Sequence, residues 1–254
     1  MGRNHHHVVK FPSNSGDCTN CENLCRCVGR GLTTTDLKDL QGITAIPKLF
    51  KRGQRLFREG EPLNYLYMVR SGAVKTYKVL SAGDEQILDF HLPGTMIGFD
   101  AISNDTYNSH ATALDTTCVC AFQFDTMADV FRRSLNTQKA FLKLVSTAIN
   151  HEQRLLITLG SKAATQRIAA FLEMLSTYHR DRGFSATQFS LPMSRTDIAN
   201  YLSLAVETVS RTLTKMQRDG TVELSRNEIA ILDLPRLQQL ANDPDKEFIA
   251  ANSG

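Results

Sequence analysis

Residues 193–220 read MSRTDIANYLSLAVETVSRTLTKMQRDG, and this stretch predicts two helices joined by a tight turn. Ser194 and Asp197, three residues apart, form a capping-box pattern with Asp in the place of Glu, so a first helix is expected from there to about Leu202. A second helix is expected over residues 206–218, where Gly220 supplies a helix stop. Two helices with this spacing are typical of a helix-turn-helix.

The other residues of this stretch predict how the two helices pack. Ala199 is small enough to let the helices approach each other closely. Ser203 occupies the turn position where glycine is usual, so a strain of about 1 kcal/mol is expected there if its φ is positive. The segments TVEL and IAIL, separated by SRNE, follow directly and predict a β-hairpin, which makes the unit winged. The residues expected between the two helices are Ile198, Leu202, Leu204, Val209 and Leu213.

The start of the second helix carries side chains that are suited to reading DNA. Glu207, Ser210 and Arg211 share one helix face, and the start of such a helix would enter the major groove. Arg211 can donate two hydrogen bonds to guanine, and Glu207 can accept one from a cytosine amino group. Lys215 suits a phosphate. The alternative for the same pattern is the solvated, charged face of an ordinary surface helix.

Upstream of this unit the sequence pattern changes twice. Between Pro47 and Phe124, short β-prone runs such as YLYMVRSG and AVKTYKVL are separated by glycines, which is typical of a sandwich or jelly roll. From Phe131 to about Gly160, residues recur at alternating steps of three and four, as in the seam of a two-stranded coiled coil. The seam consists of Leu142, Val145, Ile149, Glu152, Leu156 and Leu159, in which Glu152 is the one charge.

The composition limits the class of protein. The chain has 254 residues, of which 42% are hydrophobic and 22% charged, and this fits a globular protein of two domains. The net charge of +3 is a weak indication of an anionic partner. No apolar run approaches the roughly 18 residues that a membrane helix needs, and the start of the chain does not resemble a secretory signal. We therefore expect a cytoplasmic protein without membrane contact.

Residues 17–29 read DCTNCENLCRCVG and contain four of the six cysteines of the chain. In the cytosol disulfides are rare, and clustered cysteines more often bind metal or carry out redox chemistry. Cys18, Cys21 and Cys27 have the spacing C-x2-C-x5-C, which suits thiolate ligands of an iron–sulfur cluster and also leaves zinc open. The three histidines at residues 5–7 are expected to be part of a polar tail.

The order of strands, long helix and winged helix-turn-helix resembles the cAMP receptor protein superfamily of bacterial transcription regulators. The motifs VETVSR and GDEQILDFHLPGTMIGFDAI are similar to its oxygen-responsive branch, the fumarate and nitrate reduction (FNR) regulators. The resemblance runs from about Cys18 to Leu232 and implies an α+β protein. The expected parts are a cysteine-rich cluster-binding segment (1–32), a β jelly-roll sensor domain (33–130), a dimerisation helix (131–161) and a winged helix-turn-helix domain (162–254).

This resemblance also implies the sites. A [4Fe–4S] cluster would be held by the N-terminal cysteines together with Cys120, while Cys25 would be a free thiol and Cys118 a core residue. The cluster would control formation of a homodimer, which would bind palindromic DNA with TTGAT-like half-sites and contact RNA polymerase. The implied cluster ligands are Cys18, Cys21, Cys27 and Cys120, the DNA-binding residues are Glu207, Thr208, Ser210, Arg211 and Lys215, and the dimer switch is Ile149, Glu152 and Leu156.

Cyclic-nucleotide binders of this superfamily carry a Gly-Glu pair and an Arg-Ser pair for the ribose and phosphate. The corresponding stretches here read GFDAIS and NSHATAL, with Asn108 in the place of the phosphate-binding Arg, so we expect no cyclic nucleotide. No convincing catalytic constellation is present, and an enzyme is not expected. The alternatives that stay open are a nitric oxide or redox sensor with the same cysteine site, and a zinc-stabilised DNA-binding protein without a switch.

Overall fold

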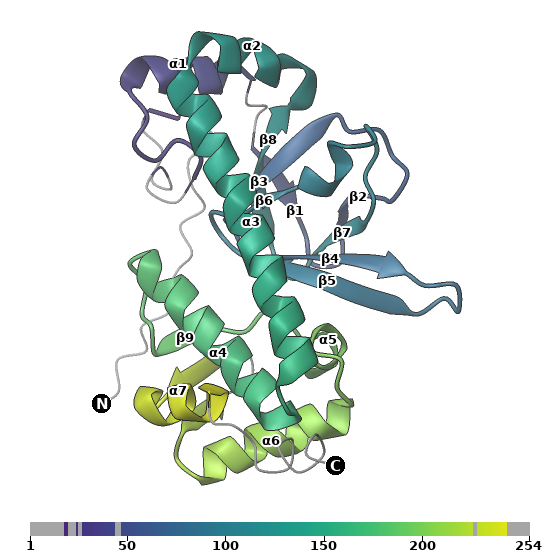
Figure 1. The fold of residues 1–254 in the computed structure, drawn as a ribbon, viewed down its shortest axis with the longest axis vertical. Helices are drawn as coiled ribbons and strands as arrows, with labels where there is room; N and C mark the ends of the chain where they lie inside the picture. Colours follow the sequence, from purple (N-terminus) through teal and green to yellow (C-terminus); the bar gives the residue numbers. More distant parts are fainter. Residues whose placement is uncertain (1–17, 20–23, 25–26, 44–46, 226–227, 243–254) are drawn as a thin grey trace.

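The computed structural model describes residues 18–19, 24, 27–43, 47–225 and 228–242. In this part of the chain, one long helix, α3 (Leu135–Ser161), runs the length of the molecule, with a β-sheet domain beside its first half and a second, mainly helical domain at its C-terminal end (Figure 1). The predicted fold class, an α+β protein with a jelly roll, a long helix and a winged helix-turn-helix, is confirmed.

The β-sheet domain is a sandwich of two four-stranded antiparallel sheets, with strand orders β1-β8-β3-β6 and β2-β7-β4-β5. Its core lies between the sheets, where the rings of Phe57 and Tyr107 stack with their centroids 3.8 Å apart. Gly72, with φ of 80°, lies in the turn between β3 and β4, and a Cβ there would lie 2.5 Å from the Thr116 carbonyl oxygen. The strands are β1 (Lys48–Phe50), β2 (Arg55–Phe57), β3 (Tyr65–Ser71), β4 (Val74–Val79), β5 (Glu85–His91), β6 (Met96–Ile97), β7 (His110–Ala113) and β8 (Thr117–Gln123).

The first helix, α1 (Thr34–Ile43), is formed by the stretch TTDLKDLQGI and continues through Gly42. Thr33 caps it, because its Oγ1 accepts a hydrogen bond from the Asp36 N–H at 3.2 Å while the Asp36 carboxylate accepts one from the Thr33 N–H at 3.2 Å. The helical region expected from Phe131 is divided in two. Residues up to Arg133 belong to a short helix, α2 (Met127–Arg133), and α3 starts afresh because Ser134 is extended and its Oγ accepts from the Thr137 N–H at 3.0 Å.

The second domain contains the predicted helix-turn-helix. The capping box of the first helix is present, since the Ser194 Oγ accepts from the Asp197 N–H at 3.1 Å and the Asp197 carboxylate accepts from the Ser194 N–H at 2.9 Å. Ser203 in the turn has φ of 53°. Strand β9 adds a third strand to the wing, which the sequence did not predict. The elements are α4 (Ala164–Asp181), β9 (Gln188–Ser190), α5 (Arg195–Tyr201), α6 (Val206–Arg218), β10 (Val222–Ser225), β11 (Glu228–Ile231) and α7 (Leu234–Asn242).

Candidate functional site

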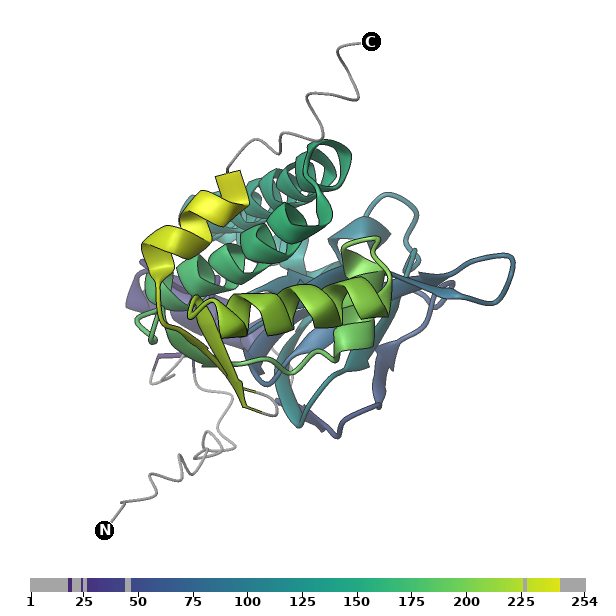
Figure 2. The same ribbon diagram turned by 90° about the horizontal axis from the view of Figure 1, so that it is seen from below.

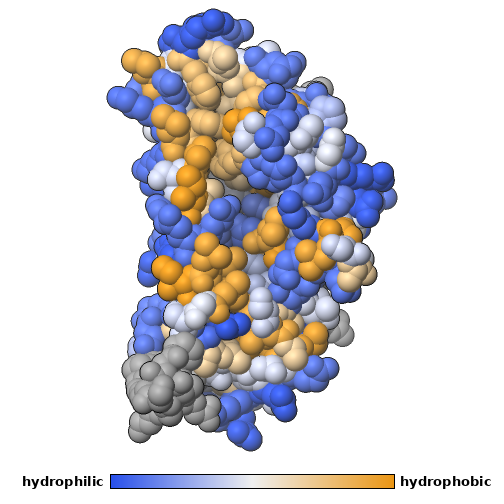
Figure 3. All heavy atoms as spheres, turned by 45° about the vertical axis from the view of Figure 1, so that its right-hand side comes forward, coloured by the Kyte–Doolittle hydropathy of each residue, from blue (hydrophilic) through white to orange (hydrophobic). Residues whose placement is uncertain are grey.

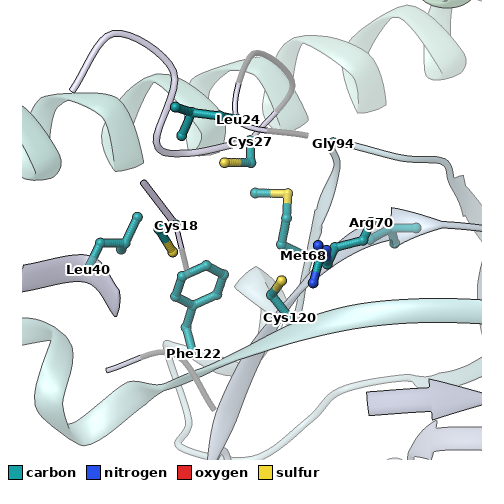
Figure 4. Close-up of a pocket in the computed structure, with 10 residues that line it drawn as sticks. Cys18, Leu24, Cys27, Leu40, Met68, Arg70, Gly94, Cys120 and Phe122 are labelled. Atoms are coloured by element: carbon teal, nitrogen blue, oxygen red, sulfur yellow. The ribbon is translucent and has the colours of Figure 1, made fainter. Parts of the chain in front are cut away.

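A pocket lies between the N-terminal segment and the sheet that contains β3 and β8, and three of the predicted ligands line it (Figure 4). Cys18 and Cys27 come from the N-terminal segment and Cys120 from β8. The other predicted ligand, Cys21, and the predicted free thiol, Cys25, lie outside the described residues. The pocket is lined by Cys18, Leu24, Cys27, Leu40, Met68, Val69, Arg70, Gly94, Cys120 and Phe122.

The pairing of β3 with β8 determines which side chains reach this pocket. Cys120 lies opposite Met68. The register then shifts between Val69 and Ser71, which makes Arg70 the extra residue of a β-bulge. Arg70 is only 6% exposed, and its guanidinium group points into the pocket near Cys120 (Figure 4). A bulge at this position therefore delivers a buried cation next to a thiol.

Cys118, two residues before Cys120 on the same strand, has different surroundings. It pairs with Leu49 on β1 and with Ser71 on β3, it is 8% exposed, and it is absent from the lining of the pocket. These are the surroundings of a core cysteine.

A tight backbone turn holds Cys27 in place. The Gly29 N–H donates to the Cys27 Sγ at 3.2 Å, a contact that favours the thiolate over the thiol. A Cβ on Gly29 would lie 2.7 Å from the Leu24 Cδ1 and 2.9 Å from the Leu37 Cδ2. A side chain at residue 29 would therefore have to displace the ends of these two leucine side chains.

The donor atoms of the pocket favour a soft metal. Among the described residues, its lining offers three cysteine sulfurs, the Met68 thioether, one cation and otherwise apolar groups, without a carboxylate or an imidazole. Thiolate sulfur suits iron–sulfur clusters and zinc rather than hard cations. The free space is about 30 Å³, on the scale of a single water molecule. Within the described residues, no three His, Cys, Asp or Glu side chains are close enough to hold a metal ion.

The pocket is connected to the start of α3 through α1. Leu40 of α1 lines the pocket, and one helix turn earlier Asp36 accepts a hydrogen bond from the Asn136 Nδ2 at 3.4 Å. Hydrogen bonds from the Ser134 and Thr33 hydroxyls lower the pKa of the Asp36 carboxyl, so this residue is held as a carboxylate at the N-terminus of α3. A shift of α1 would therefore change the contact between Asp36 and Asn136 at the N-terminus of α3.

Helix α6 presents the predicted DNA-reading residues on its outer face. Glu207, Arg211 and Lys215 are exposed, and Thr208 and Ser210 are half-buried. The opposite face of the helix is buried, with Val209 0% and Leu213 3% exposed. Viewed from below, α6 lies across the front of the molecule with no described element in front of it (Figure 2). The helix is therefore open to a large ligand such as a DNA duplex.

Helix α3 exposes large apolar side chains at every seventh position: Leu135, Leu142, Ile149 and Leu156 are 67%, 57%, 49% and 69% exposed. In the space-filling view, apolar surface continues in a broken band along the course of α3 (Figure 3). Glu152 is also exposed on this helix. A heptad stripe of this kind fits a partner helix rather than water.

Two features of the cysteine pocket escaped the sequence analysis. Arg70 could have been noticed in the sequence, because it is the one charge in the otherwise apolar run YLYMVR. Its β-bulge could not, because the bulge depends on the pairing of β3 with β8. The sequence gives no indication of the close packing at Gly29, because that packing involves Leu37 of α1. In the part of the chain that the structure describes, no helix has both the length and the apolar character needed to cross a bilayer.

Comparisons with known proteins agree with this architecture. A family model for the cyclic nucleotide-binding domain matches residues 47–134, and one for the Crp-like helix-turn-helix domain matches residues 166–240. The transcriptional activator protein anr of Pseudomonas aeruginosa is 40% identical over 224 residues, which cover 88% of this chain and 92% of that protein. The fumarate and nitrate reduction regulatory protein of Escherichia coli K12 is 39% identical, with 88% and 90% covered. The solved structure of FixK2 from Bradyrhizobium japonicum superposes with a TM-score of 0.71 at 29% identity, covering 78% of this chain and 97% of that one.

Proposed function

The chain belongs to the fumarate and nitrate reduction family of transcription regulators, and we propose that it is an oxygen-responsive activator of anaerobic gene expression. In this proposal the cysteine pocket is the sensor, α3 forms a homodimer, and α6 reads DNA. The observation that carries the proposal is that Cys18, Cys27 and Cys120, which are far apart in sequence, line one pocket that is connected through α1 to the start of α3.

The proposed ligands of a [4Fe–4S] cluster are Cys18, Cys21, Cys27 and Cys120. When bound, such a cluster supplies an oxygen-labile link between the N-terminal segment and β8. The Gly29 N–H supports a thiolate at Cys27, and Arg70 supplies a buried positive charge beside Cys120. Both contacts stabilise negative charge on sulfur, so they favour ligation over the neutral thiol.

Dimer formation would use the heptad stripe of α3. With Cys18, Cys21 and Cys27 tied to β8, the N-terminal segment would hold Leu40 and α1 against the sandwich, and Asp36 would fix the start of α3. The proposed switch residues, Ile149, Glu152 and Leu156, lie farther along the same helix.

The DNA target would be an inverted repeat of TTGAT-like half-sites, read by Glu207, Thr208, Ser210 and Arg211, with Lys215 on phosphate. Activation would also require contact with RNA polymerase. We propose no cyclic nucleotide ligand, because Asn108 donates to the Asp100 carbonyl oxygen at 2.5 Å and offers no cation to a phosphate.

The proposed units are residues 1–32 for the cluster, 33–130 for the sensor domain, 131–161 for dimerisation and 162–254 for DNA binding. We assign the protein no enzymatic activity and place its action in the cytoplasm.

A zinc-stabilised DNA-binding protein without a switch is the second candidate, because a sulfur-only ligand set also suits zinc. An absorption spectrum with iron and sulfide counts on anaerobically isolated protein separates the two. Brown protein with stoichiometric iron and sulfide supports the cluster, and colourless protein with zinc overturns it. Separate additions of oxygen and of nitric oxide to the brown protein then decide which of the two gases is the signal.

A further inference from the structure

Asp89 lies at a junction of three parts of the molecule. It is on β5 of the sensor domain, and its Oδ1 accepts from the His151 Nε2 of α3 at 3.0 Å and from the Tyr201 hydroxyl of α5 at 3.4 Å. The side chains of Asp89 and His151 are 23% and 27% exposed, so this contact is largely shielded from water. One carboxylate therefore joins the sandwich, the dimerisation helix and the helix-turn-helix.

A second set of contacts docks α5 on the same strand. The Asn200 Nδ2 donates to the Glu85 carbonyl oxygen at 2.6 Å, and the Asn200 Oδ1 accepts from the Ile87 N–H at 2.6 Å. Lys75 on β4 lies 3.2 Å from Asp197 of α5 and 2.8 Å from Glu85. The docked orientation of α5 thus depends on an edge of the sensor domain that lies away from the cysteine pocket.

The charged and titratable groups around His151 come from four elements. Asp89 and His91 face it from β5, with the His91 Nδ1 4.0 Å from Asp89, and Tyr201 faces it from α5. The Thr76 Oγ1 of β4 forms a hydrogen bond with the His91 Nε2 at 3.0 Å. The negative charge of Asp100, in the short helix Phe99–Ala101, favours the protonated form of His91. On the helix of His151 itself, the charge of Arg154 disfavours a proton on His151 and the charge of Glu152 favours it.

These groups define how the junction responds to protons. The hydrogen bond to Asp89 raises the pKa of His151, although burial opposes it. Burial raises the pKa of Asp89, but the hydrogen bond from His151 and the charges of the two histidines outweigh it and leave that pKa below its usual range. Burial lowers the pKa of His91. Contact between Asp89 and His151 is therefore strongest when Asp89 is ionised and His151 is protonated, and it weakens as the pH rises through the pKa of His151.

We infer that Asp89, His151 and Tyr201 form a latch that holds the helix-turn-helix against the sensor domain and is closed by a proton on His151. The latch needs no bound cofactor, because all three side chains belong to the described fold. It fixes the angle between α3 and α6, and a dimer can place two recognition helices in successive major grooves only if that angle is fixed. The consequence for DNA affinity rests on the proposed function, whereas the latch itself does not.

Opening the latch would pivot the second domain rather than release it. Arg167 at the start of α4 donates through its Nη2 to the Leu159 carbonyl oxygen at 2.7 Å and through its Nη1 to the Leu202 carbonyl oxygen at 3.1 Å. These bonds tie the end of α3 to the turn of the helix-turn-helix. They carry no group that titrates near neutral pH, so they persist when His151 loses its proton.

The first test uses the full-length chain in air, without metal or DNA. NMR titration of the histidine rings is expected to show His151 titrating above the ordinary histidine value of about 6.5. In Asp89→Asn it should move to that value or below. The matched control is Asp84→Asn, which removes the same charge from the exposed turn between β4 and β5. An unchanged His151 titration in Asp89→Asn, or an equal change in the control, would overturn the latch.

Hydrogen exchange of the Ile87 amide reports the docked state directly, because that N–H donates to Asn200 across the junction. After correction for intrinsic exchange, its protection is expected to be roughly fivefold greater at pH 6.5 than at pH 8, as for a shielded charge-assisted contact. Tyr201→Phe and His151→Gln should reduce this difference, and they keep the test decisive if Asp89→Asn fails to fold. Protection that is the same at both pH values in the wild type contradicts the inference.

DNA binding then separates this inference from the proposed function. On a duplex with an inverted TTGAT-like site, anaerobic wild type is expected to bind more tightly at pH 6.5 than at pH 8, by a factor that Asp89→Asn reduces and Asp84→Asn retains. Equal affinity and equal pH dependence in all three proteins overturns the latch. A chain that shows the His151 titration and the Ile87 protection but does not bind this duplex retains the latch and contradicts the proposed function instead.

Discussion

The helix-turn-helix and the cysteine pocket are built in opposite ways. The helix pair α5–α6 and its turn come from one stretch of 28 residues, 193–220, including a capping box that closes over three residues, and Arg167 of α4 adds a hydrogen bond to the turn. The pocket takes residues from the N-terminal segment, from α1, from β3, from the loop at Gly94 and from β8. The first is determined by local chemistry, and the second exists only after the sandwich has formed. A change in the pocket can therefore alter the proposed sensor site while leaving the pair of helices α5 and α6 intact.

The largest expected effect is at the cysteines. Cys120→Ser should abolish the anaerobic brown chromophore, and so should serine at Cys18, Cys21 or Cys27, because each substitution leaves the cluster with three of its four proposed thiolate ligands. Absorbance and iron content of each variant measure this. The matched control is Cys118→Ser, which lies on the same strand but outside the pocket and should retain most of the chromophore, as should Cys25→Ser.

The opposite result at the two strand cysteines, with colour lost in Cys118→Ser and kept in Cys120→Ser, would show that the assembled site differs from the pocket described here. In every variant, far-ultraviolet circular dichroism should remain that of the wild type, because a cysteine-to-serine change leaves the backbone hydrogen bonds of the helices and strands in place.

The next effect joins the two regions through α3. Glu152 interrupts a stripe in which Ile149 and Leu156 are 49% and 69% exposed, and in a parallel dimer it would meet its own copy. Burying an unpaired charge costs several kcal/mol, whereas each apolar side chain contributes about 1.5–3 kcal/mol on burial. Glu152→Ala is expected to dimerise in air, without cluster, and to bind its DNA site. Sedimentation of the aerobic protein measures the oligomeric state. A variant that stays monomeric at concentrations at which the anaerobic wild type is dimeric would contradict this prediction.

A smaller effect tests the DNA reader alone. Arg211→Ala should weaken binding to a TTGAT-type site by about 1–3 kcal/mol and relax the preference at the guanine. Lys215→Ala, on the same exposed face, should weaken specific and non-specific DNA about equally and flatten the salt dependence. Fluorescence anisotropy at several salt concentrations separates them. If Arg211→Ala lost as much on random DNA as on the site, Arg211 would be a phosphate contact.

The smallest effect is at the turn. Ser203 has φ of 53°, so Ser203→Gly is expected to raise the free energy of unfolding by up to about 1 kcal/mol without changing DNA affinity. Asp105→Gly is a matched control, because Asp105 has φ of 55° but lies in the sensor domain. Urea unfolding measures both. Destabilisation by Ser203→Gly would mean that the serine makes a contact worth more than the strain.

Sequence reasoning was correct where the contacts are local in the chain. The capping box at Ser194 and the positive φ at Ser203 have the predicted form. The seam expected on α3 agrees only in part, because Leu142, Ile149 and Leu156 are exposed whereas Val145 packs against the core of the sandwich. Cys120 was named through a resemblance, not through spacing. Its neighbourhood could not be predicted, because the bulge at Arg70 and the fit of Gly29 against Leu37 arise from segments that meet only in the folded chain.

The bulge between β3 and β8 has an evolutionary consequence. Val69 pairs with Val119 and Ser71 with Cys118, so Arg70 is an insertion in an otherwise continuous ladder. Deleting this one residue would bring serine into the regular register and leave the remaining strand pairs unchanged. In evolution, a single-codon insertion or deletion at this point would therefore be enough to add or remove a buried cation beside the proposed ligand Cys120.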